Sequence, residues 1–434
     1  MASQAQLTQP QTGSVSDLKA YCRAIADRAC AASRQLASIS GSARSAALKR
    51  VAALLLERAD QLKDANAKDL AAGKDAGLSS AMSDRLRIDD KRIESIVSSV
   101  RQIADQADPI GQVIEGYVRP NGLKLQKVRV PIGVVLIIYE SRPNVTSDAA
   151  ALCIRSANAV ILRGGKEARH SNAAIAACVR DGLKDVGLDP DCVQLVETTD
   201  RAAVGELLKL DGRIDLCIPR GGESLIRAVV EQAHIPVIKH YAGNCHVYVD
   251  GDCDDQMALD ICVNAKVQRP GVCNAAETIL FHAAAADRDL LARTCRALAD
   301  RGVQVRGDAR TCCLFTDAEP AVEEDWGTEY LDLIVAVRVV DSVQEAIDHI
   351  NRYGSKHTDA IVTSSVEAAD AFVAGVDSAN VFVNCSTRFS DGGEYGLGAE
   401  IGISTDKLHA RGPMGAADLT TYKWVVHGTG QTRS

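Results

Sequence analysis

The sequence predicts an α/β protein built from two doubly wound domains. Its length of 434 residues points to two or three domains, because one domain takes roughly 150 residues. From residue 133 onward, short continuous apolar runs alternate with helical stretches, which is typical of parallel strands buried on both faces. A composition of 46% hydrophobic and 24% charged residues is ordinary for a folded enzyme and excludes a disordered or fibrous chain.

The first hundred residues predict a polar tail followed by helices. Residues 1–15 are rich in Gln, Ser and Thr and indicate a flexible tail. Ser16-Asp17 suits a helix N-cap, and apolar residues follow it at helical spacing. Two further apolar stripes, over 48–62 and 93–104, predict two more helices.

A β-hairpin follows this helical part. Residues 113–118 and 123–130 alternate roughly between apolar and polar and flank a Pro-Asn-Gly turn, which is a hairpin pattern. Residues 420–426 read as a lone strand with no partner nearby in sequence. We expect that strand to pair either with the hairpin or with another subunit.

Between these segments lie two α/β blocks. In the first block we expect strands at 134–139, 159–162, 193–196, 214–218 and 236–239, with helices near 147–157, 170–186, 200–210 and 222–233. In the second block we expect strands at 246–249, 278–281, 333–340, 360–362 and 381–383, with helices near 253–267, 287–300, 341–352 and 365–375.

Charge and composition exclude several classes of partner. The formal net charge of −8 argues against nucleic acid, because binding to its backbone needs a basic surface. No apolar run approaches the roughly 18 residues of a membrane span, and the N-terminus lacks the basic and apolar regions of a signal peptide. We therefore expect a cytoplasmic protein.

The cysteines and histidines do not predict a metal centre. The 14 cysteines are scattered without a CxxC pair, so most are expected to be small buried residues in a reducing compartment. Cys312 and Cys313 are expected at a strand end. His234, His240 and His246 recur at a spacing of six, which metal-binding pairs on helices or hairpins do not use.

Two glycine turns are candidate anion sites. A GxGxxG dinucleotide fingerprint is absent, but Arg163-Gly-Gly-Lys166 and Pro219-Arg-Gly221-Gly222 each follow a predicted strand and precede a helix. Ligands of α/β sheets bind at such strand ends, where the N–H groups of a helix N-terminus attract anions. Arg163 and Lys166 would suit the 2′-phosphate of NADPH. A solvated charged turn is an equally good interpretation of these two residues.

One cysteine stands apart from the others. Cys273 lies in the segment 268–274 (QRPGVCN), whose Pro-Gly pair makes a sharp turn between a predicted helix and a predicted strand. Such a turn could present the thiol to a cleft. A nucleophilic cysteine needs nearby cations or a helix N-terminus to lower its pKa, and Lys266 and Arg269 are close in sequence. The alternative is an inert thiol.

Several long segments, in this order, resemble the aldehyde dehydrogenase superfamily. They are VPIGV from Val130, YESRPNVT over 139–146, VILRGGKE over 160–167, the cysteine segment 268–274, AIDHINRYGSKHTDAI over 346–361, and GLGAEIGIST from Gly396 with Met414-Gly415. The resemblance covers nearly the whole chain beyond residue 15. Within the superfamily it is closest to members that reduce an acyl phosphate.

The resemblance implies the catalytic roles. Cys273 would be the nucleophile, and Asn144 with the backbone N–H of Cys273 would stabilise the oxyanion. His240 stands where hydrolytic members carry a general-base glutamate that activates water. The departure argues against an ordinary aldehyde oxidiser, because an acyl-phosphate reductase must avoid thioester hydrolysis.

The resemblance also implies how NADPH is bound. Arg163 falls where the superfamily contacts the adenosine ribose, and Lys166 falls where NAD-preferring members often have an acid, which favours NADPH. Pro219, Gly221 and Gly222 would lie along the pyrophosphate. Glu329 would hold the nicotinamide ribose.

The activity implied is the NADPH-dependent reduction of L-glutamyl 5-phosphate to L-glutamate 5-semialdehyde through a cysteine thioester, with release of phosphate. Cations should line the cleft for this anionic substrate, and the candidates are Arg142, Arg269, Arg388 and Arg411. The alternatives are a CoA-acylating or hydrolytic member, or a non-catalytic subunit that binds glutamate 5-kinase. A transient contact with that kinase is compatible with catalysis.

The resemblance further implies an aldehyde dehydrogenase-like domain organisation. We expect an NADPH-binding domain over 16–112 and 131–245 and a catalytic domain over 246–417. Residues 113–130 and 418–434 would form a small β element that joins subunits into a homodimer or homotetramer.

Overall fold

The structure is a computed structural model that describes residues 17–433; the expected tail over 1–15 lies outside the described residues. The described chain forms two compact units. Unit 1 contains the residues up to Ile238, Leu397–Ile401 and the residues from Gly415 onward, and unit 2 contains Lys239–Gly396 and Gly402–Met414. The chain thus enters unit 2 at Lys239, a few residues before the domain boundary that we expected.

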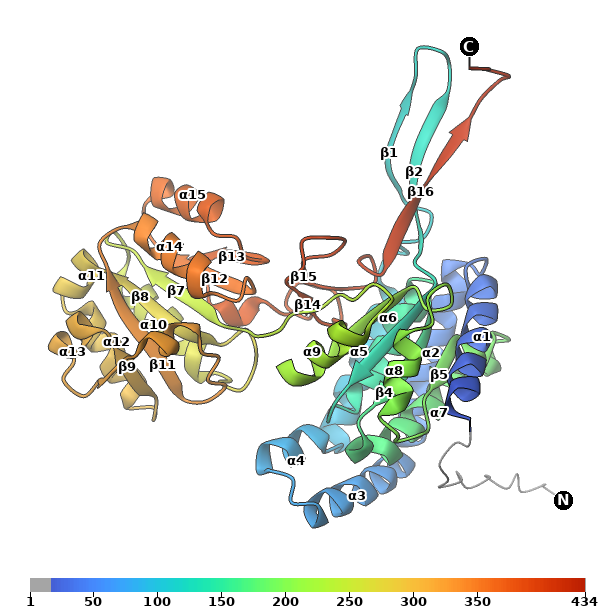
Figure 1. The fold of residues 1–434 in the computed structure, drawn as a ribbon, viewed down its shortest axis with the longest axis horizontal. Coiled ribbons are helices and arrows are strands. Elements are labelled where there is room, and N and C mark those ends of the chain that lie inside the picture. Colours follow the sequence, from blue (N-terminus) through green and yellow to red (C-terminus); the bar gives the residue numbers. More distant parts are fainter. Residues whose placement is uncertain (1–16, 434) are drawn as a thin grey trace. The chain divides into compact units, whose positions relative to one another are not determined.

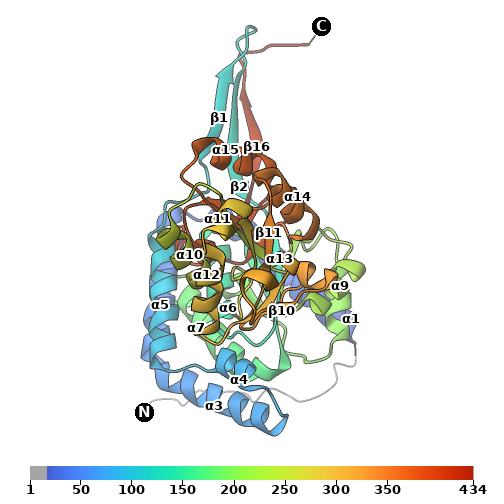
Figure 2. The same ribbon diagram turned by 90° about the vertical axis from the view of Figure 1, so that its left-hand side faces the viewer.

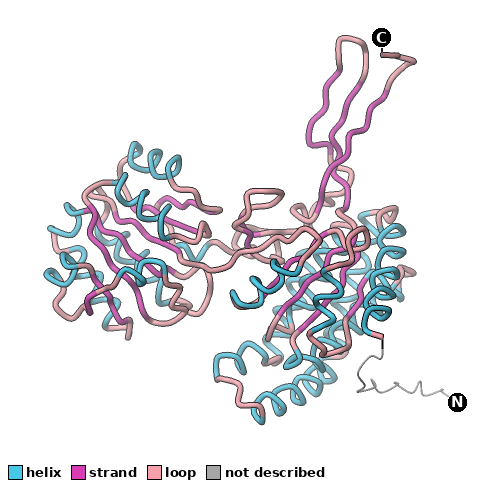
Figure 3. Tube along the Cα trace, in the orientation of Figure 1, coloured by secondary structure: helices cyan, strands magenta, loops and turns pink. Residues whose placement is uncertain are grey.

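Unit 1 is built on a four-stranded parallel sheet with strand order β5-β4-β3-β6. Its strands are β3 (Val134–Tyr139), β4 (Ala159–Gly164), β5 (Val193–Leu195) and β6 (Leu216–Arg220). All six residues of β3 are buried, which explains its continuous apolar run, because both faces of the sheet are covered by helices (Figure 3). The expected strand over 236–239 is wrong: this segment contributes only an isolated bridge between Val237 and Cys217.

Helices cover both faces of this sheet. They are α1 (Leu18–Leu36), α2 (Gly41–Glu57), α3 (Ala59–Asp75), α4 (Ser80–Leu86), α5 (Asp90–Asp105), α6 (Asn144–Arg155), α7 (Arg169–Asp185), α8 (Ala202–Leu208) and α9 (Glu223–Gln232), with short 3-10 turns η1 (Lys166–Ala168) and η2 (Pro190–Cys192). Asp17 caps α1 as predicted, since its Oδ1 accepts from the N–H of Ala20 at 2.9 Å. The single helix expected over 48–62 is wrong. The backbone of Arg58 leaves the helical conformation, and α3 starts directly after it.

The hairpin and the C-terminal strand form one antiparallel sheet. Its order is β1-β2-β16, with β1 at Val113–Val118, β2 at Lys124–Pro131 and β16 at Thr420–His427. Figures 1 and 2 show β2 between the two other strands. The first of our two alternatives for residues 420–426 is therefore confirmed: β16 pairs with β2 along its whole length.

Unit 2 is built on a seven-stranded parallel sheet with strand order β10-β9-β11-β8-β7-β12-β13. Its strands are β7 (Cys245–Val249), β8 (Ala276–His282), β9 (Gln304–Gly307), β10 (Glu319–Pro320), β11 (Ile334–Val340), β12 (Thr358–Val362) and β13 (Asn380–Val383). The two faces have separate cores, because Val247 and Val249 pack on one side and Tyr248 on the other. This confirms a second doubly wound domain.

The helices of unit 2 lie on both faces of its sheet (Figure 1). They are α10 (Asp255–Val267), α11 (Ala283–Asp287), α12 (Leu290–Ala299), α13 (Ala309–Leu314), α14 (Val343–Tyr353) and α15 (Val366–Gly375), with 3-10 turns η3 (Glu323–Gly327) and η4 (Thr387–Phe389) and a two-strand ladder of β14 (Ile403–Ser404) and β15 (Gly412–Pro413). Cys312 and Cys313 lie in α13 and not at a strand end. Asp308 starts this helix, since its carboxylate accepts from the N–H of Thr311 at 2.8 Å.

Across the described chain, no helix is both long enough and apolar enough to traverse a bilayer.

Candidate active site

Cys273 lies on the predicted turn, between the end of α10 and the start of β8. Its side chain is half-buried. The next residue, Asn274, is only 5% exposed and ties the turn to η4, because its Nδ2 donates to the carbonyl of Ser390 at 2.8 Å. The turn therefore holds the thiol on a fixed backbone.

A glycine on a neighbouring segment contacts this turn. A Cβ atom on Gly243 would lie 2.1 Å from the carbonyl oxygen of Cys273 and 2.5 Å from its Cα. The backbone N–H of Gly243 donates to Oε1 of Glu329 at 2.8 Å. Glu329, expected at the nicotinamide ribose, is thus hydrogen-bonded to the residue that contacts the cysteine turn.

Two imidazoles accompany the thiol. His240, Cys273 and His357 each have one side-chain nitrogen or sulfur atom that could coordinate a metal ion, and these three atoms all lie within 4.8 Å of one another. The two rings meet edge to face, with centroids 5.5 Å apart. His240 is half-buried and His357 is fully buried. Sequence reasoning singled out His240 but gave no role to His357, although His357 lies in the segment 346–361 that carries the resemblance.

Cys245 is hydrogen-bonded to the cysteine turn. Its Sγ donates to the carbonyl of Cys273 at 3.1 Å and lies 3.6 Å from Nδ1 of His357. Burial raises the pKa of Cys245 well above its ordinary value. Burial likewise raises the pKa of Cys22 to about 11 and that of Cys295 to about 12. These thiols are protonated near neutral pH, in keeping with the expectation that most cysteines are inert.

Two of the predicted arginines lie near Cys273. Nε of Arg388 donates to Oε1 of Gln268 at 2.8 Å, so Arg388 is attached to the start of the cysteine turn. The pKa of Arg388 is lowered, chiefly by burial and next by the nearby charge of Arg269. Two guanidinium groups that repel each other beside a thiol favour the binding of an anion there.

Arg411 and Arg142 have different settings. Arg411 donates to the carboxylate and carbonyl of Asp377 at 2.9 and 3.0 Å. The pKa of Asp377 is lowered to about 2 by the hydrogen bond from Lys407 first and by Arg411 next. Arg411 is therefore already paired with an acid. Arg142 follows β3 in unit 1.

Asn144 is the first residue of α6 in unit 1, and its side chain is exposed. Its Nδ2 donates to Oδ2 of Asp148 one turn later, at 2.9 Å. Burial raises the pKa of Asp148 to about 6. The sequence did not draw attention to Asp148, although the i, i+4 spacing places the two side chains on one helix face.

Arg163 and Lys166 differ in exposure. Arg163 is the penultimate residue of β4, is 8% exposed, and donates to the carbonyls of Gly164 and Thr199. Burial lowers its pKa. Lys166 begins η1 and is exposed. Lys166 is thus the residue of this pair that is available to a ligand in solvent.

The second glycine turn already faces an acid. Pro219 is buried in β6, whereas Gly221 and Gly222 are exposed, and Gly222 precedes α9. The N–H of Gly222 donates to Oε2 of Glu140 at 3.3 Å, and a Cβ on Gly221 would lie 2.5 Å from that oxygen. The helix terminus therefore attracts an anionic group here, as its positive end should.

A buried ion pair lies behind the cysteine turn. Lys266 and Glu277 are both 0% exposed, and their charged atoms are 2.6 Å apart. Glu277 also accepts from the N–H of Leu331 at 3.2 Å. Burial raises the pKa of Glu277 to about 7. Sequence reasoning placed Lys266 near Cys273 but missed its pairing with Glu277, which ties α10 to β8.

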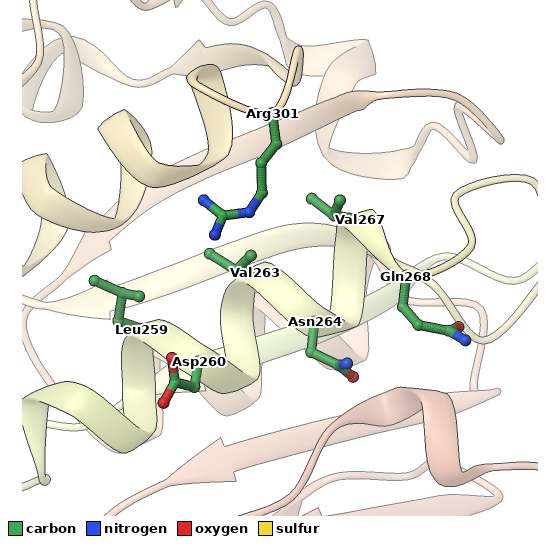
Figure 4. Close-up of a pocket in the computed structure, with 7 residues that line it drawn as sticks. All are labelled: Leu259, Asp260, Val263, Asn264, Val267, Gln268 and Arg301. Carbon is green, nitrogen blue, oxygen red and sulfur yellow. The ribbon is translucent and has the colours of Figure 1, made fainter.

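A surface hollow of about 300 Å³ runs along one face of α10. Figure 4 shows its lining residues Leu259, Asp260, Val263, Asn264, Val267, Gln268 and Arg301. None of the predicted catalytic, cofactor or substrate residues lines it.

Comparison with known proteins gives consistent results. Residues 2–309 match the model of the aldehyde dehydrogenase family. The gamma-glutamyl phosphate reductase of Rhodopirellula baltica is 52% identical over 99% of this chain and 100% of that protein. The enzyme of the same name from Desulfatibacillum aliphaticivorans is 54% identical over 94% of this chain and 98% of its own.

A solved structure of similar sequence has the same fold. The gamma-glutamyl phosphate reductase of Thermotoga maritima superposes with a TM-score of 0.92 at 43% identity, covering 95% of this chain and 100% of that one. An acetylating aldehyde dehydrogenase from Geobacillus thermoglucosidasius superposes with a TM-score of 0.68 at 16% identity, covering 96% and 98%. The second likeness concerns the fold alone.

Proposed function

This chain belongs to the aldehyde dehydrogenase family and, within it, to the gamma-glutamyl phosphate reductases, and we propose that it reduces L-glutamyl 5-phosphate with NADPH. The product would be L-glutamate 5-semialdehyde, and the reaction would serve proline biosynthesis. The observation that carries this function is the Cys273 turn, which combines a half-buried thiol with two imidazoles and two guanidinium groups.

Cys273 is the nucleophile in this proposal. Its thiolate attacks the acyl carbon of the substrate, the C–O bond to phosphate breaks, and a thioester remains. His240 and His357 each have a ring nitrogen within 4.8 Å of the thiol sulfur, and one of them would take its proton. Arg269 and Arg388 bind the phosphate as it leaves, and Arg142 and Arg411 are further candidates for the anionic groups of the substrate. Arg411 would first have to leave Asp377.

Asn144 serves the proposed reaction as an oxyanion donor. Its amide, together with the backbone N–H of Cys273, would stabilise the negative charge that develops on the acyl oxygen. In unit 1 the same amide is held by Asp148, which fixes the rotamer from which it donates. Asp148 therefore acts as a positioning residue for Asn144.

The residues of unit 1 fit NADPH. Lys166 is exposed beside Arg163 and suits the 2′-phosphate, and the N–H of Gly222 already binds a carboxylate where a pyrophosphate oxygen would lie. Pro219 lies just before this turn on β6, and the carboxylate of Glu140 would have to leave Gly221 and Gly222 for the pyrophosphate to bind. Glu329 would hold the nicotinamide ribose. When bound, NADPH supplies the hydride that reduces the thioester.

His240 supports reduction over hydrolysis. It lies beside Cys273, at the position where hydrolytic members carry a water-activating glutamate. Because that glutamate is absent, the proposal assigns phosphate rather than water as the partner of the acyl group in the reverse direction.

The three-stranded sheet supports the proposal of a homodimer or homotetramer. It exposes several large apolar side chains, namely Val113, Ile114, Tyr117, Val118, Tyr422, Trp424 and Val426, and such a patch is typical of an interface. A transient contact with glutamate 5-kinase would protect the labile acyl phosphate. We place the enzyme in the cytoplasm, where reducing conditions keep the Cys273 thiol reactive.

The decisive experiment is the reverse reaction. NADP⁺ reduction is followed with glutamate 5-semialdehyde, with and without inorganic phosphate, which avoids the unstable acyl phosphate. We expect strict dependence on phosphate, because phosphate must resolve the thioester. Turnover without phosphate would mean that water resolves it, and the hydrolytic alternative would replace this proposal.

A variant tests the nucleophile separately. Cys273→Ala should abolish phosphate-dependent turnover while NADPH still binds, as measured by its fluorescence. Cys313→Ala is the matched control, because Cys313 is an exposed cysteine of the same unit, and it should keep both properties. Retained turnover in Cys273→Ala would remove the nucleophile assignment.

A further inference from the structure

We propose that His240, Cys273 and His357 bind a Zn²⁺ ion, and that the bound ion masks the thiol of Cys273. The three side chains come from different segments of unit 2: the loop before β7, the turn before β8 and the residue that precedes β12. Their candidate ligand atoms all lie within 4.8 Å of one another. Binding of the ion depends on this geometry alone and not on the reaction proposed above.

The ligand set matches the chemistry of zinc. Thiolate and imidazole are preferred ligands, and tetrahedral bonds of about 2.0–2.3 Å place neighbouring ligand atoms about 3.5 Å apart. Shifts of about 1 Å, within the reach of side-chain rotation, would therefore close the site. Three protein ligands leave a fourth position for water.

The surroundings of His357 suit a metal-binding imidazole. Its Nδ1 lies 2.9 Å from Oγ1 of Thr358, which in turn donates to Oγ of Ser390 at 2.9 Å. Nδ2 of Asn380 contacts the same Thr358 hydroxyl at 3.3 Å. Imidazoles that bind zinc usually have the opposite nitrogen hydrogen-bonded in this way, so the arrangement orients Nε2 toward the ion.

The site has one thiolate and not two. Cys245 lies close to both Cys273 and His357, but its Sγ already donates to the carbonyl of Cys273 at 3.1 Å. Cys245 keeps this hydrogen bond, and the metal takes Cys273 alone.

The regular histidine spacing in the sequence does not describe this site. His246 is fully buried in β7, and its Nδ1 lies 2.9 Å from Oδ1 of Asp359. His234 follows α9 in unit 1. Only His240 of that trio joins the cluster with Cys273.

Binding needs no redox partner. The Cys273 S–H bond breaks, its proton passes to the buffer, and the sulfur lone pair forms the S–Zn bond. While this lone pair is shared with the metal, the sulfur cannot attack an acyl carbon or an alkylating reagent. If the proposed function holds, zinc would be a reversible inhibitor.

Zinc affinity is measured by competition with a chromophoric chelator, using the reduced, metal-free full chain. We expect one Zn²⁺ per chain. His240→Gln and His357→Gln should each weaken binding at least 10-fold, and Cys273→Ser at least 100-fold. The controls His427→Gln and Cys313→Ser, both at exposed positions, should bind as the unmodified chain does.

Equal affinity across these variants would mean an adventitious ion only and would overturn the proposal. Because His357 is buried, its substitution could disturb folding, and His240→Gln at a half-buried position is the decisive variant. Unchanged affinity in His240→Gln alone also overturns the three-ligand site.

Two further readouts test the thiolate directly. Co²⁺ in place of Zn²⁺ should give a thiolate-to-metal charge-transfer absorption that Cys273→Ser loses and Cys313→Ser keeps. Saturating Zn²⁺ should slow alkylation of Cys273 by iodoacetamide at least 10-fold, as followed by peptide mass spectrometry, and a chelator should restore the rate. Absence of the absorption band, or an unchanged alkylation rate, would contradict the proposal.

Discussion

Gly243 and Cys273 touch through their backbones, so closely that a Cβ on Gly243 would lie 2.1 Å from the Cys273 carbonyl oxygen. Real Cβ atoms do not come this near to a backbone oxygen, so any other residue at 243 would displace the cysteine turn. Gly243 is required because a side chain has no room here, and not for its backbone conformation, since its φ lies outside the left-handed region.

We therefore expect Gly243→Ala to lower kcat/KM at least 10-fold while the chain remains folded, because small shifts of a nucleophile cost much activity. Gly327→Ala is the matched control, since a Cβ on Gly327 meets nothing within 4 Å. Steady-state kinetics and circular dichroism check the pair. Equal activity of the two variants would contradict the importance of this contact.

Asn144→Ala should lower kcat by about 100- to 1000-fold with little change in KM, the usual cost of one oxyanion donor. The amide donates to Asp148 and not to a backbone group, so its loss should leave α6 intact. Single-turnover kinetics of thioester formation give the test. A variant with unchanged kcat would assign the oxyanion site to other donors.

Lys166→Glu should weaken NADPH more than NADH, because it places a negative charge beside the expected 2′-phosphate. Hydrogen bonds to charged groups contribute about 1.5–3 kcal/mol, so the ratio of kcat/KM for the two cofactors should fall by roughly 10- to 100-fold. Lys68→Glu, at an exposed position on α3, controls for the change in net charge. An unchanged preference would remove Lys166 from the cofactor site.

His349 should make unit 2 sensitive to acid. Burial, then the neighbouring His246 and Arg338, lower its pKa from 6.5 to about 2, and its Nδ1 faces Nη1 of Arg338 at 3.0 Å. The folded chain holds this imidazole neutral, whereas the unfolded chain protonates it below pH 6.5. Its contribution to stability is therefore complete above pH 6.5 and is lost progressively as the pH falls toward 2.

Between pH 7 and pH 5 this residue should reduce the free energy of unfolding by about 2 kcal/mol. In His349→Gln, urea unfolding at the two pH values should show a correspondingly smaller difference. His427→Gln, at an exposed position of β16, should behave as the unmodified chain. The same acid loss in both variants would show that another group titrates.

The parallel strands could be predicted because burial on both faces requires continuous apolar runs, and β3 satisfies this at all six positions. The break between α2 and α3 at Arg58 could not be predicted, because α3 begins at the next residue and the apolar spacing continues across the break. The Cys273 turn was visible through its local Pro-Gly chemistry. The roles of Gly243 and His357 could not be predicted, because they arise only when folding brings distant segments of the chain into contact.

The pairing of β16 with β2 constrains the order of events at the ribosome. Gln431 donates to the carbonyl of Asn121, 310 positions earlier, and unit 1 includes the residues from Gly415 onward. While unit 2 is being translated, β2 has no partner along the edge that β16 later occupies. Such an unpaired strand edge is prone to pair with other chains. The hairpin residues that face this edge stay unpaired until β16 emerges and closes it.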